Sequence, residues 1–268
     1  MKHIHIASIS PRAGTTLLME LMVSCFEFDG YADHELELLF HPTEKVDRFC
    51  SKNPGYKDLQ LAPSALRRWP DLWIICLVRD PRDIVVSRHK KQPDAYWSNF
   101  GKVFDHMRYF ETAKRHERFI VVRYEDLVKD PNAVQADLMK AIPFLKKRFD
   151  FSEFPKIASP TKGAVEALGG VRKISTSSIG RWENELPRLK AQIERYGKID
   201  KVLSELGYEN NSSWQKKLDT VHADNGRSYL EDLPPHKHKP INRLRRLYHI
   251  LRFHIGFPKK RPIIVAEN

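Results

Sequence analysis

Apolar residues occur along the chain in short runs, separated by longer stretches in which they recur three or four positions apart. The run at 72–78 is continuously apolar, which is typical of a strand in the middle of a parallel sheet covered on both faces. Shorter runs at 3–7, 48–51 and 119–123 are predicted as further strands. Strands that alternate with helices at this spacing predict an α/β fold, a three-layer α/β/α arrangement around a central parallel sheet.

Proline and capping residues mark the predicted helices. Pro63 is expected to open a helix that ends at Trp69, because proline suits a first turn. Asp130 is expected to cap a helix that begins at Pro131. Pro187 is predicted to start a later helix, and Gly207 to end another. The predicted helices cover 63–69, 84–90, 100–115 and 131–141, and the segment 28–33 is predicted as a connector.

The segment 8–18 joins the first strand to a helix that opens on Thr15 and Thr16, through a turn of small residues that contains Gly14. In this geometry free backbone amides and the positive end of the helix converge on one point, which predicts a bound anion. The P-loop of a nucleoside triphosphatase needs a Lys just before its Ser/Thr and an earlier Gly. Both are missing, and Arg12 supplies the cation instead.

Other candidate residues follow the predicted strands. Lys52, the segment 79–83 and Tyr124 each lie at the carboxyl end of a strand. Ligands of parallel α/β sheets bind at that edge, so these residues and the loop at 8–16 are expected on one rim.

Length and charge define two parts of the chain. With 268 residues, a main domain at 1–210 and a basic C-terminal extension at 211–268 are predicted. The net charge of +12 indicates an anionic partner such as a nucleotide, a nucleic acid, an acidic glycan or a membrane surface. No apolar run is long enough to span a bilayer and no secretory signal is recognisable, so a cytoplasmic location is expected. Cys25, Cys50 and Cys76 are predicted as buried thiols.

The extension contains a predicted linker at 234–240 and an amphipathic helix. The apolar stripe of this helix consists of Ile241, Leu244, Leu247, Tyr248 and Leu251. The stripe is expected to be buried on the same chain, on a second subunit or on a membrane surface. Docking on the protein itself is the favoured prediction, with peripheral membrane contact as a secondary one.

Four separated motifs resemble those of the sulfotransferases that use 3'-phosphoadenosine 5'-phosphosulfate (PAPS). The sequence Pro-Arg-Ala-Gly-Thr-Thr at 11–16 resembles their 5'-phosphosulfate loop, and Arg-Asp-Pro-Arg-Asp at 79–83 with Ser87 resembles their 3'-phosphate motif. The segment 123–127 is similar to the one whose Tyr contacts the adenine, and 180–184 to the element that closes over the nucleotide. The resemblance covers about 1–206, and it implies a P-loop-like nucleotide-binding site that releases 3'-phosphoadenosine 5'-phosphate (PAP).

The resemblance implies specific nucleotide contacts and no metal. The residues implied are Arg12, Ala13, Gly14, Thr15, Thr16, Arg79, Ser87, Tyr124, Arg172, Lys173 and Arg181. The acceptor is expected to be a hydroxyl or an amine of a carbohydrate or small molecule.

The candidate catalytic residues match the motifs of these sulfotransferases less fully than the nucleotide-binding residues do. Arg12 and Lys52 are the candidates that stabilise charge on the departing phosphate. Lys52-Asn53-Pro54 resembles the Lys-Asp-Pro element of the tyrosylprotein type. In the cytosolic small-molecule type a catalytic His follows the Lys by two residues, and Pro54 occupies that place here. Glu35 is the favoured general base, with His34 as the alternative.

Two other classes compete with this interpretation. A P-loop kinase or nucleotidase would use Asp80 as a magnesium ligand, but the Gly-Lys-Ser/Thr sequence is missing. A nucleic-acid-binding module would need aromatic residues interleaved with the basic ones, and no such pattern lies outside the tail. No nucleic-acid partner is therefore expected.

Overall fold

The structure, a computed structural model, describes residues 1–89, 92–232 and 240–266. A six-stranded sheet with the order β10-β2-β4-β1-β5-β8 forms its centre. Neighbouring strands are parallel except for the pair of β10 and β2. The strands of this sheet are β1 (Lys2–Ser8), β2 (Gly30–Glu35), β4 (Arg48–Lys52), β5 (Leu72–Val78), β8 (Phe119–Arg123) and β10 (Ile264–Val265).

Strand β5 is buried because it lies between β1 and β8 and is covered on both faces. Ile6 of β1 is in register with Ile75 of β5, and Ile74 of β5 with Phe119 of β8. Full burial of an aliphatic side chain of this size stabilises a fold by about 2 kcal/mol, so these strands supply much of the core. The predicted strands and the central parallel sheet are confirmed.

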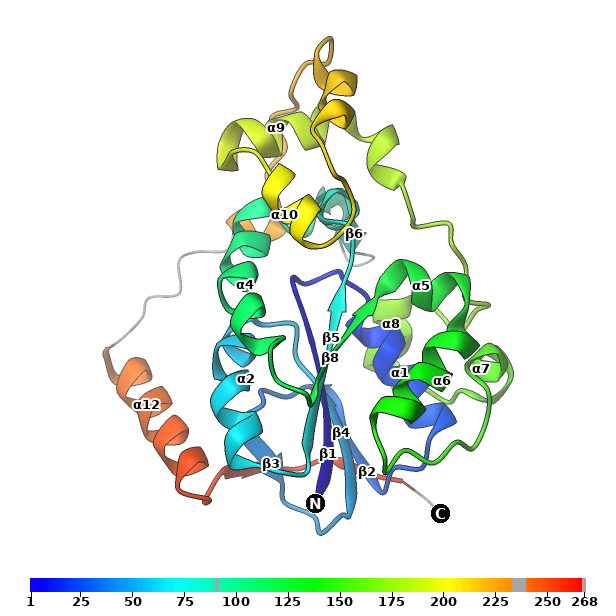
Figure 1. Ribbon diagram of the computed structural model, residues 1–268, viewed down its shortest axis with the longest axis vertical. Coiled ribbons are helices and arrows are strands. Elements are labelled where there is room, and N and C mark those ends of the chain that lie inside the picture. Colours follow the sequence, from blue (N-terminus) through cyan, green and yellow to red (C-terminus); the bar gives the residue numbers. More distant parts are fainter. Residues whose placement is uncertain (90–91, 233–239, 267–268) are drawn as a thin grey trace.

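Helices cover both faces of the sheet (Figure 1). One face carries α2 (Tyr56–Arg68) and α4 (Phe100–Ala113). The other face carries α1 (Thr15–Cys25), α5 (Tyr124–Lys129), α6 (Pro131–Ala141), α7 (Phe154–Ile157) and α8 (Lys162–Leu168), with the 3-10 turn η1 (Phe151–Glu153). The three-layer α/β/α fold is thus confirmed.

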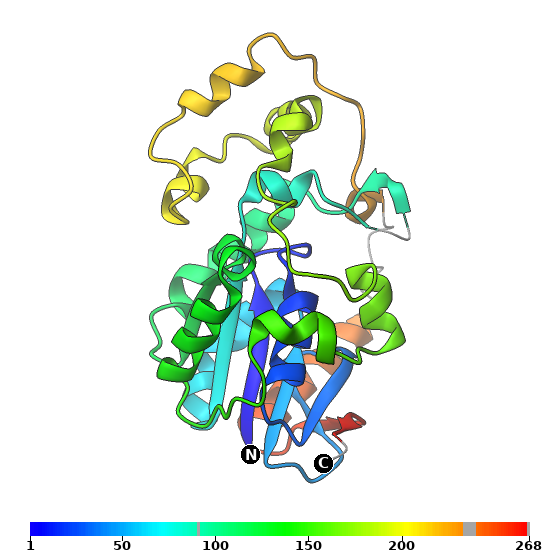
Figure 2. The ribbon, with the colours of Figure 1, turned by 90° about the vertical axis from the view of Figure 1, so that its right-hand side faces the viewer.

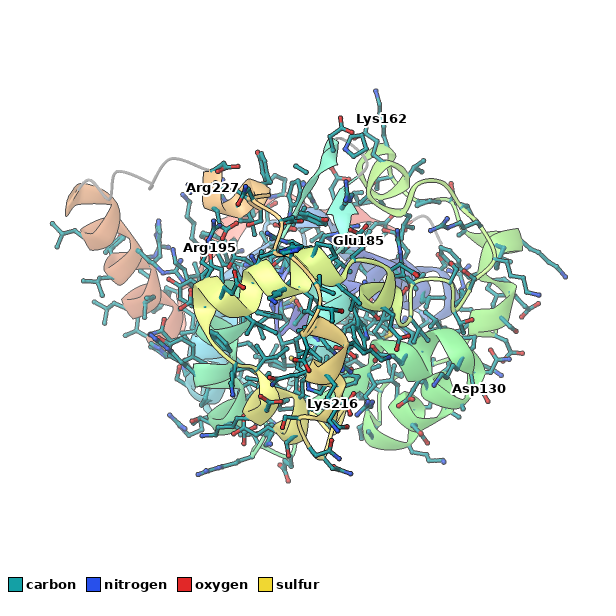
Figure 3. The ribbon with its side chains drawn as sticks, turned by 90° about the horizontal axis from the view of Figure 1, so that it is seen from above. Asp130, Lys162, Glu185, Arg195, Lys216 and Arg227 are labelled. Carbon is teal, nitrogen blue, oxygen red and sulfur yellow. The ribbon has the colours of Figure 1, made fainter. Side chains whose placement is uncertain are left out.

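A helical cap lies beyond the carboxyl ends of the strands (Figures 1 and 2). It consists of η2 (Arg181–Asn184), α9 (Leu186–Tyr196), α10 (Asp200–Glu205), η3 (Ser213–Leu218) and α11 (Tyr229–Asp232). Seen from above, α9 runs across the molecule between Glu185 and Arg195 (Figure 3). Arg188 of α9 is fully buried and donates to the carbonyls of Gly226 (2.8 Å) and Ser98 (3.2 Å), which fixes the cap on the body.

Two helix predictions are wrong in their limits. Pro63 does not open a helix but lies inside α2, which begins at Tyr56. Buried residues on both sides of Pro63, among them Leu59 and Leu66, hold the helix together despite the lost backbone hydrogen bond. The predicted helix 84–90 is replaced by α3 (Pro81–Val85), followed by the strand pair β6 (Arg88–His89) and β7 (Gln92–Tyr96).

Long-range contacts explain the early end of α3. The carbonyl of Ser87 accepts from the amide of Trp97 (3.0 Å), and the side chain of Ser87 is bound by Arg12. The predicted connector at 28–33 is also wrong, because Gly30–Glu35 forms β2 beside β4. Pairing with a neighbouring strand, which no local pattern reveals, determines this segment.

The C-terminal segment packs against the body at two places. Helix α12 (Pro240–His254) lies outside α2 (Figure 1), and β9 (Lys259–Arg261) pairs with β3 (Phe40–Pro42). The predicted linker lies outside the described residues except for Pro240. The division of the chain at residue 210 stays a prediction. Within the described ranges no helix is long and apolar enough to cross a bilayer.

The three cysteines are buried free thiols, as predicted. Burial is the main reason that the pKa of Cys25 is raised to about 12. A thiol with so high a pKa is a poor nucleophile at neutral pH.

Candidate functional site

The turn between β1 and α1 leaves the first amides of α1 free. Gly14 caps the helix in the left-handed region (φ 103°) without a side-chain hydrogen bond, and no acidic residue lies in the first turn. Arg12 also has a positive φ of 78°, so both residues bend the chain tightly. Free amides and the helix dipole together form an anion-binding position. Ala13 and Thr15 are buried beside it, and Thr16 is half-buried.

Arg12 links this loop to the segment after α3. Its Nε donates to Oγ of Ser87 (3.2 Å), and its Nη2 donates to the carbonyl of Arg88 (3.1 Å). The residues predicted to hold two different phosphates are thereby joined by a direct hydrogen bond. One continuous site results.

Arg79, at the end of β5, contacts the same loop. Its Nη1 donates to the carbonyl of Arg12 (3.0 Å), and its Nη2 to the carbonyl of Ser178 (2.7 Å). The guanidinium lies 4.6 Å from the ring centre of Tyr124, whose hydroxyl is 2.7 Å from Oγ of Ser178. Arg79 and Tyr124 thus lie together, and Ser178 closes over both.

Among the described residues, neither Arg12 nor Arg79 forms a direct ion pair with a carboxylate, although the charge of Arg79 acts on the nearby Asp83. Their hydrogen bonds go to carbonyls and a hydroxyl. Burial, and secondly the charge of Arg79, lowers the pKa of Arg12 to about 10. Two adjacent cations in a partly buried position repel each other, so a bound anion would relieve an existing electrostatic cost.

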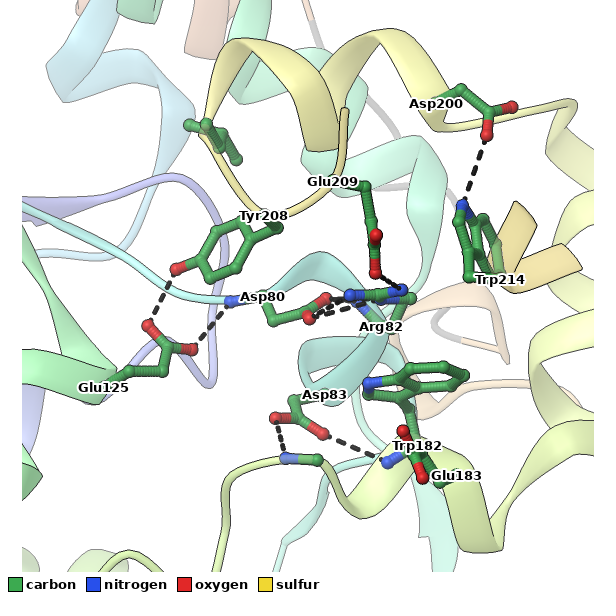
Figure 4. Close-up of polar contacts among 12 residues, drawn as sticks. Asp80, Arg82, Asp83, Glu125, Trp182, Glu183, Asp200, Tyr208, Glu209 and Trp214 are labelled. Carbon is green, nitrogen blue, oxygen red and sulfur yellow. Dashed lines mark hydrogen bonds and ion pairs between the residues drawn. The ribbon is translucent and has the colours of Figure 1, made fainter. Parts of the chain in front are cut away.

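Asp83 fixes the segment that carries Ser178. Its carboxylate accepts from the amides of Gly180 (2.8 Å) and Trp182 (3.0 Å), as Figure 4 shows. Arg172, Lys173 and Arg181 are exposed on the same segment. Their predicted contacts with the nucleotide stay predictions. Ser178 was missed because it is one of four consecutive Ser or Thr residues at 175–178, and the sequence does not show which of them contacts Arg79.

Asp80 is engaged by a neighbouring arginine (Figure 4). Its Oδ2 lies 2.7 Å from Nη2 of Arg82, and its Oδ1 also accepts from the amide of Arg82 (2.9 Å). Arg82 in turn pairs with Glu209 (2.7 Å) and stacks 4.2 Å from the ring centre of Trp182. This buried network joins the end of β5 to the cap.

Glu125 supports the same strand end. It accepts from the amide of Asp80 (3.0 Å) and from the hydroxyl of Tyr208 (2.7 Å), both drawn in Figure 4. The strand ends, α5 and the cap are therefore held in a fixed relation around the candidate site.

Lys52 ends β4, two strands away from Arg79 in the sheet. Burial lowers its pKa, and the nearby carboxylates of Glu35 and Glu20 partly oppose that shift. Glu35 is paired in register with Lys52 on the neighbouring strand β2. The predicted base and the predicted catalytic lysine therefore lie side by side, while His34 is exposed next to them.

A buried hydrogen-bond chain fixes the backbone around Lys52. Oγ of Ser51 lies 2.8 Å from ring nitrogens of both His3 and His5, and His5 lies 3.0 Å from Oδ2 of Asp58. The same oxygen accepts from Nδ2 of Asn53 (3.0 Å). Ser51 and Asn53, the residues before and after Lys52, are thus both held in place by hydrogen bonds.

Glu20 is a further candidate that the sequence reasoning missed. It lies in the middle of α1 and is only 6% exposed. Burial raises its pKa to about 7, against the opposing charge of Lys52, while Asp33 raises it further. The available signal was a single carboxylate in the otherwise apolar stretch Leu17 to Met22.

Metal ligands do not gather at this site. In the ranges that the structure describes, no group of three or more His, Cys, Asp or Glu side chains is arranged to hold a metal ion.

Part of the chain matches a known protein family. Residues 24–143 match the model of the sulfotransferase family, a range that contains Glu35, Lys52, Arg79, Ser87 and Tyr124. Over these residues, the predicted resemblance to sulfotransferases is confirmed. A search of curated protein sequences gives no match.

Solved structures with a similar chain path include sulfotransferases. The sulfotransferase domain from the curacin biosynthetic pathway is 18% identical, with a TM-score of 0.48, and the match covers 77% of this chain and 97% of that one. A mouse sulfotransferase complexed with PAP is 16% identical, with a TM-score of 0.45, and the match covers 81% and 88% of the two chains.

Proposed function

From the sulfotransferase sequence in residues 24–143, we propose that this chain transfers a sulfuryl group from PAPS to a hydroxyl or amine of a carbohydrate or small molecule. The observation that carries the proposal is the pair of guanidinium groups, Arg12 and Arg79, held by carbonyls and a hydroxyl at the start of α1. PAPS has two separate phosphate positions, so it needs two adjacent anion sites. The resemblance assigns the 5' end to residues 12–16 and the 3'-phosphate to Arg79 and Ser87.

The reaction proceeds in line, as in phosphoryl transfer. The acceptor oxygen or nitrogen forms a bond to sulfur while the bond from sulfur to the bridging phosphate oxygen breaks. The electron pair of the broken bond remains on PAP, and Lys52 and Arg12 stabilise the charge that grows there. The acceptor proton passes to a carboxylate, for which Glu35 is proposed because it is exposed beside Lys52.

The kinase alternative is weakened by the surroundings of Asp80. A magnesium ligand must offer free carboxylate oxygens, whereas both oxygens of Asp80 accept from Arg82. Freeing them would break a buried pair and its stacking on Trp182.

The proposal predicts selective stabilisation by PAP. Measured by thermal unfolding, PAP at 100 times its dissociation constant should add about 2.7 kcal/mol of stability. AMP and ATP at the same concentration should shift the melting temperature much less, because neither has a 3'-phosphate for Arg79 and Ser87. Equal shifts with AMP, or a larger shift with ATP and magnesium, would contradict the proposal.

The acceptor requires a separate experiment. A metabolite extract incubated with the protein and PAPS, analysed by mass spectrometry for products heavier by one sulfuryl group, identifies the acceptor class directly. An extract incubated with PAP in place of PAPS is the control.

A further inference from the structure

Helix α12 presents an apolar face to solvent. Leu244, Leu247, Tyr248 and Leu251 are exposed to 66, 55, 55 and 59%. Their spacing of three and four residues places them on one side of the helix. Ile255 and Phe257, exposed to 55 and 68%, follow directly. Four members of the apolar stripe are therefore exposed. The prediction that the stripe docks on the chain itself is wrong for these four residues.

The other side of α12 is already bound to the body. Phe253 is fully buried, 5.7 Å from the ring centre of Trp69, and Arg246 forms an ion pair of 2.5 Å with Glu37. At the end of the helix, Nε of Arg68 donates to the carbonyl of His254 (2.9 Å). Turning the apolar face inward would break all three contacts, so the face has to be covered by something else.

The surrounding sequence is strongly basic. Between residues 233 and 266 there are nine Lys or Arg residues and no Asp or Glu. Arg246 is paired with Glu37, whereas Lys260 and Arg261 are exposed close after the helix. A covering surface must therefore accept apolar side chains and carry negative charge.

A second copy of the chain fits this requirement poorly. It would bring the same basic segment against itself, in a protein whose net charge is already +12. An anionic bilayer fits both features, because leucine side chains enter the boundary between headgroups and acyl chains while basic side chains remain at the phosphates. Tyr248 has the amphipathic character of residues at that boundary.

We propose that the exposed face of α12 binds the surface of an anionic membrane, with Leu244, Leu247, Tyr248, Leu251, Ile255 and Phe257 as the inserted side chains. The helix lies outside α2, away from the cap and from the turn between β1 and α1 (Figure 1). Bound in this way, the protein keeps its candidate active site open to solvent.

Sedimentation of the full chain with vesicles tests the proposal. Vesicles of phosphatidylcholine with phosphatidylserine should bind the protein at low salt, and vesicles of phosphatidylcholine alone should bind it far less. Raising the salt concentration should release it, because the basic contribution is screened. Equal binding to both vesicle types, or no binding at low salt, would overturn the proposal.

Substitutions test whether vesicle binding depends on this face of α12 or on apolar residues elsewhere on the surface. Leu247→Ser with Leu251→Ser should lower the partition coefficient about tenfold or more, because less apolar area is buried in the lipid. The matched control is Met139→Ser with Val165→Ser, two exposed apolar positions on α6 and α8 across the sheet. An unchanged melting temperature shows that the Leu variant is folded.

Two results with these variants would count against the membrane. One is vesicle binding by the Leu variant as strong as that of the original protein. The other is a concentration-dependent dimer, seen by sedimentation velocity without lipid, that the Leu variant no longer forms. In that case a second copy covers the face.

Discussion

The carboxylates near Lys52 differ in exposure, and this difference separates their expected roles. Glu35 is exposed at the end of β2, so it can reach an acceptor that arrives from solvent. Glu35→Gln keeps the shape and removes the proton acceptor. Turnover should fall by roughly 100-fold to 10,000-fold while the affinity for PAP, measured by titration calorimetry, changes little.

Two variants provide the comparison for this prediction. His34→Ala, next in the chain and also exposed, should retain most of the turnover. Glu20→Gln tests the buried carboxylate behind Lys52. If turnover is lost in one of these two variants and retained in Glu35→Gln, the assignment of the base changes accordingly.

Glu20 also predicts a pH dependence of stability. Burial raises its pKa from 4.5 to about 7 in the folded protein. Between these pH values the folded state binds more protons than the unfolded state, so stability falls as the pH rises through this window. The loss amounts to about 3 kcal/mol and is complete above about pH 7.

Glu20→Gln removes this titration. In denaturant unfolding, the variant should therefore gain stability relative to the original protein as the pH is raised from 5 to 8. Glu35→Gln, which alters an exposed carboxylate, serves as the control and should show little of this trend. A parallel pH profile for Glu20→Gln and the original protein would show that Glu20 does not hold the proton.

At the scale of elements, the turn into α1 depends on Gly14. A Cβ atom there would lie 2.6 Å from Cδ2 of Tyr124, and the φ of 103° disfavours any other residue. Gly14→Ala should cost about 1–3 kcal/mol through backbone strain and should weaken PAP binding, because the Tyr124 ring has to move.

A glycine in a regular helix is the control for that substitution. At Gly163 of α8 a Cβ would meet only Oγ1 of Thr161, at 4.0 Å. Gly163→Ala should therefore be neutral or stabilising by about 0.5–1 kcal/mol in thermal unfolding, with unchanged PAP affinity. Equal effects of both substitutions would mean that Gly14 has no special role.

Elements with strong local patterns were predictable from the sequence. The apolar run of β5 and the Asp130-Pro131 start of α6 are present as predicted, because burial and capping act over a few residues. Strand β2 and the helical turns of α2 before Pro63 were missed, because packing against β4 and the core determines them.

The same distinction holds for the candidate site. Arg12, Gly14 and Arg79 lie within short motifs, which is why the sequence alone makes them candidates. Ser178 and Glu20 become candidates only through distant residues, since Ser178 accepts a hydrogen bond from Arg79 and Glu20 acts electrostatically on Lys52. Only the folded chain brings such partners together.

At the scale of the whole molecule, the last strand joins parts of the chain that are far apart in sequence. Ile264 of β10 pairs with Tyr31 of β2, and a Cβ on Gly30 would lie 2.5 Å from Cδ1 of Ile263. This close fit makes the C-terminal segment the cover of the β2 edge. An uncovered edge strand offers free amides and carbonyls to any other extended chain.

The position of β10 has a consequence for the order of events during synthesis. Because β2 leaves the ribosome long before β10, the β2 edge stays open while the intervening elements are being made. Closing it requires a contact of very high sequence separation, the kind of step that is slow in folding. During this interval the open edge of β2 in the nascent chain can pair with a strand of another chain that is being translated from the same messenger RNA.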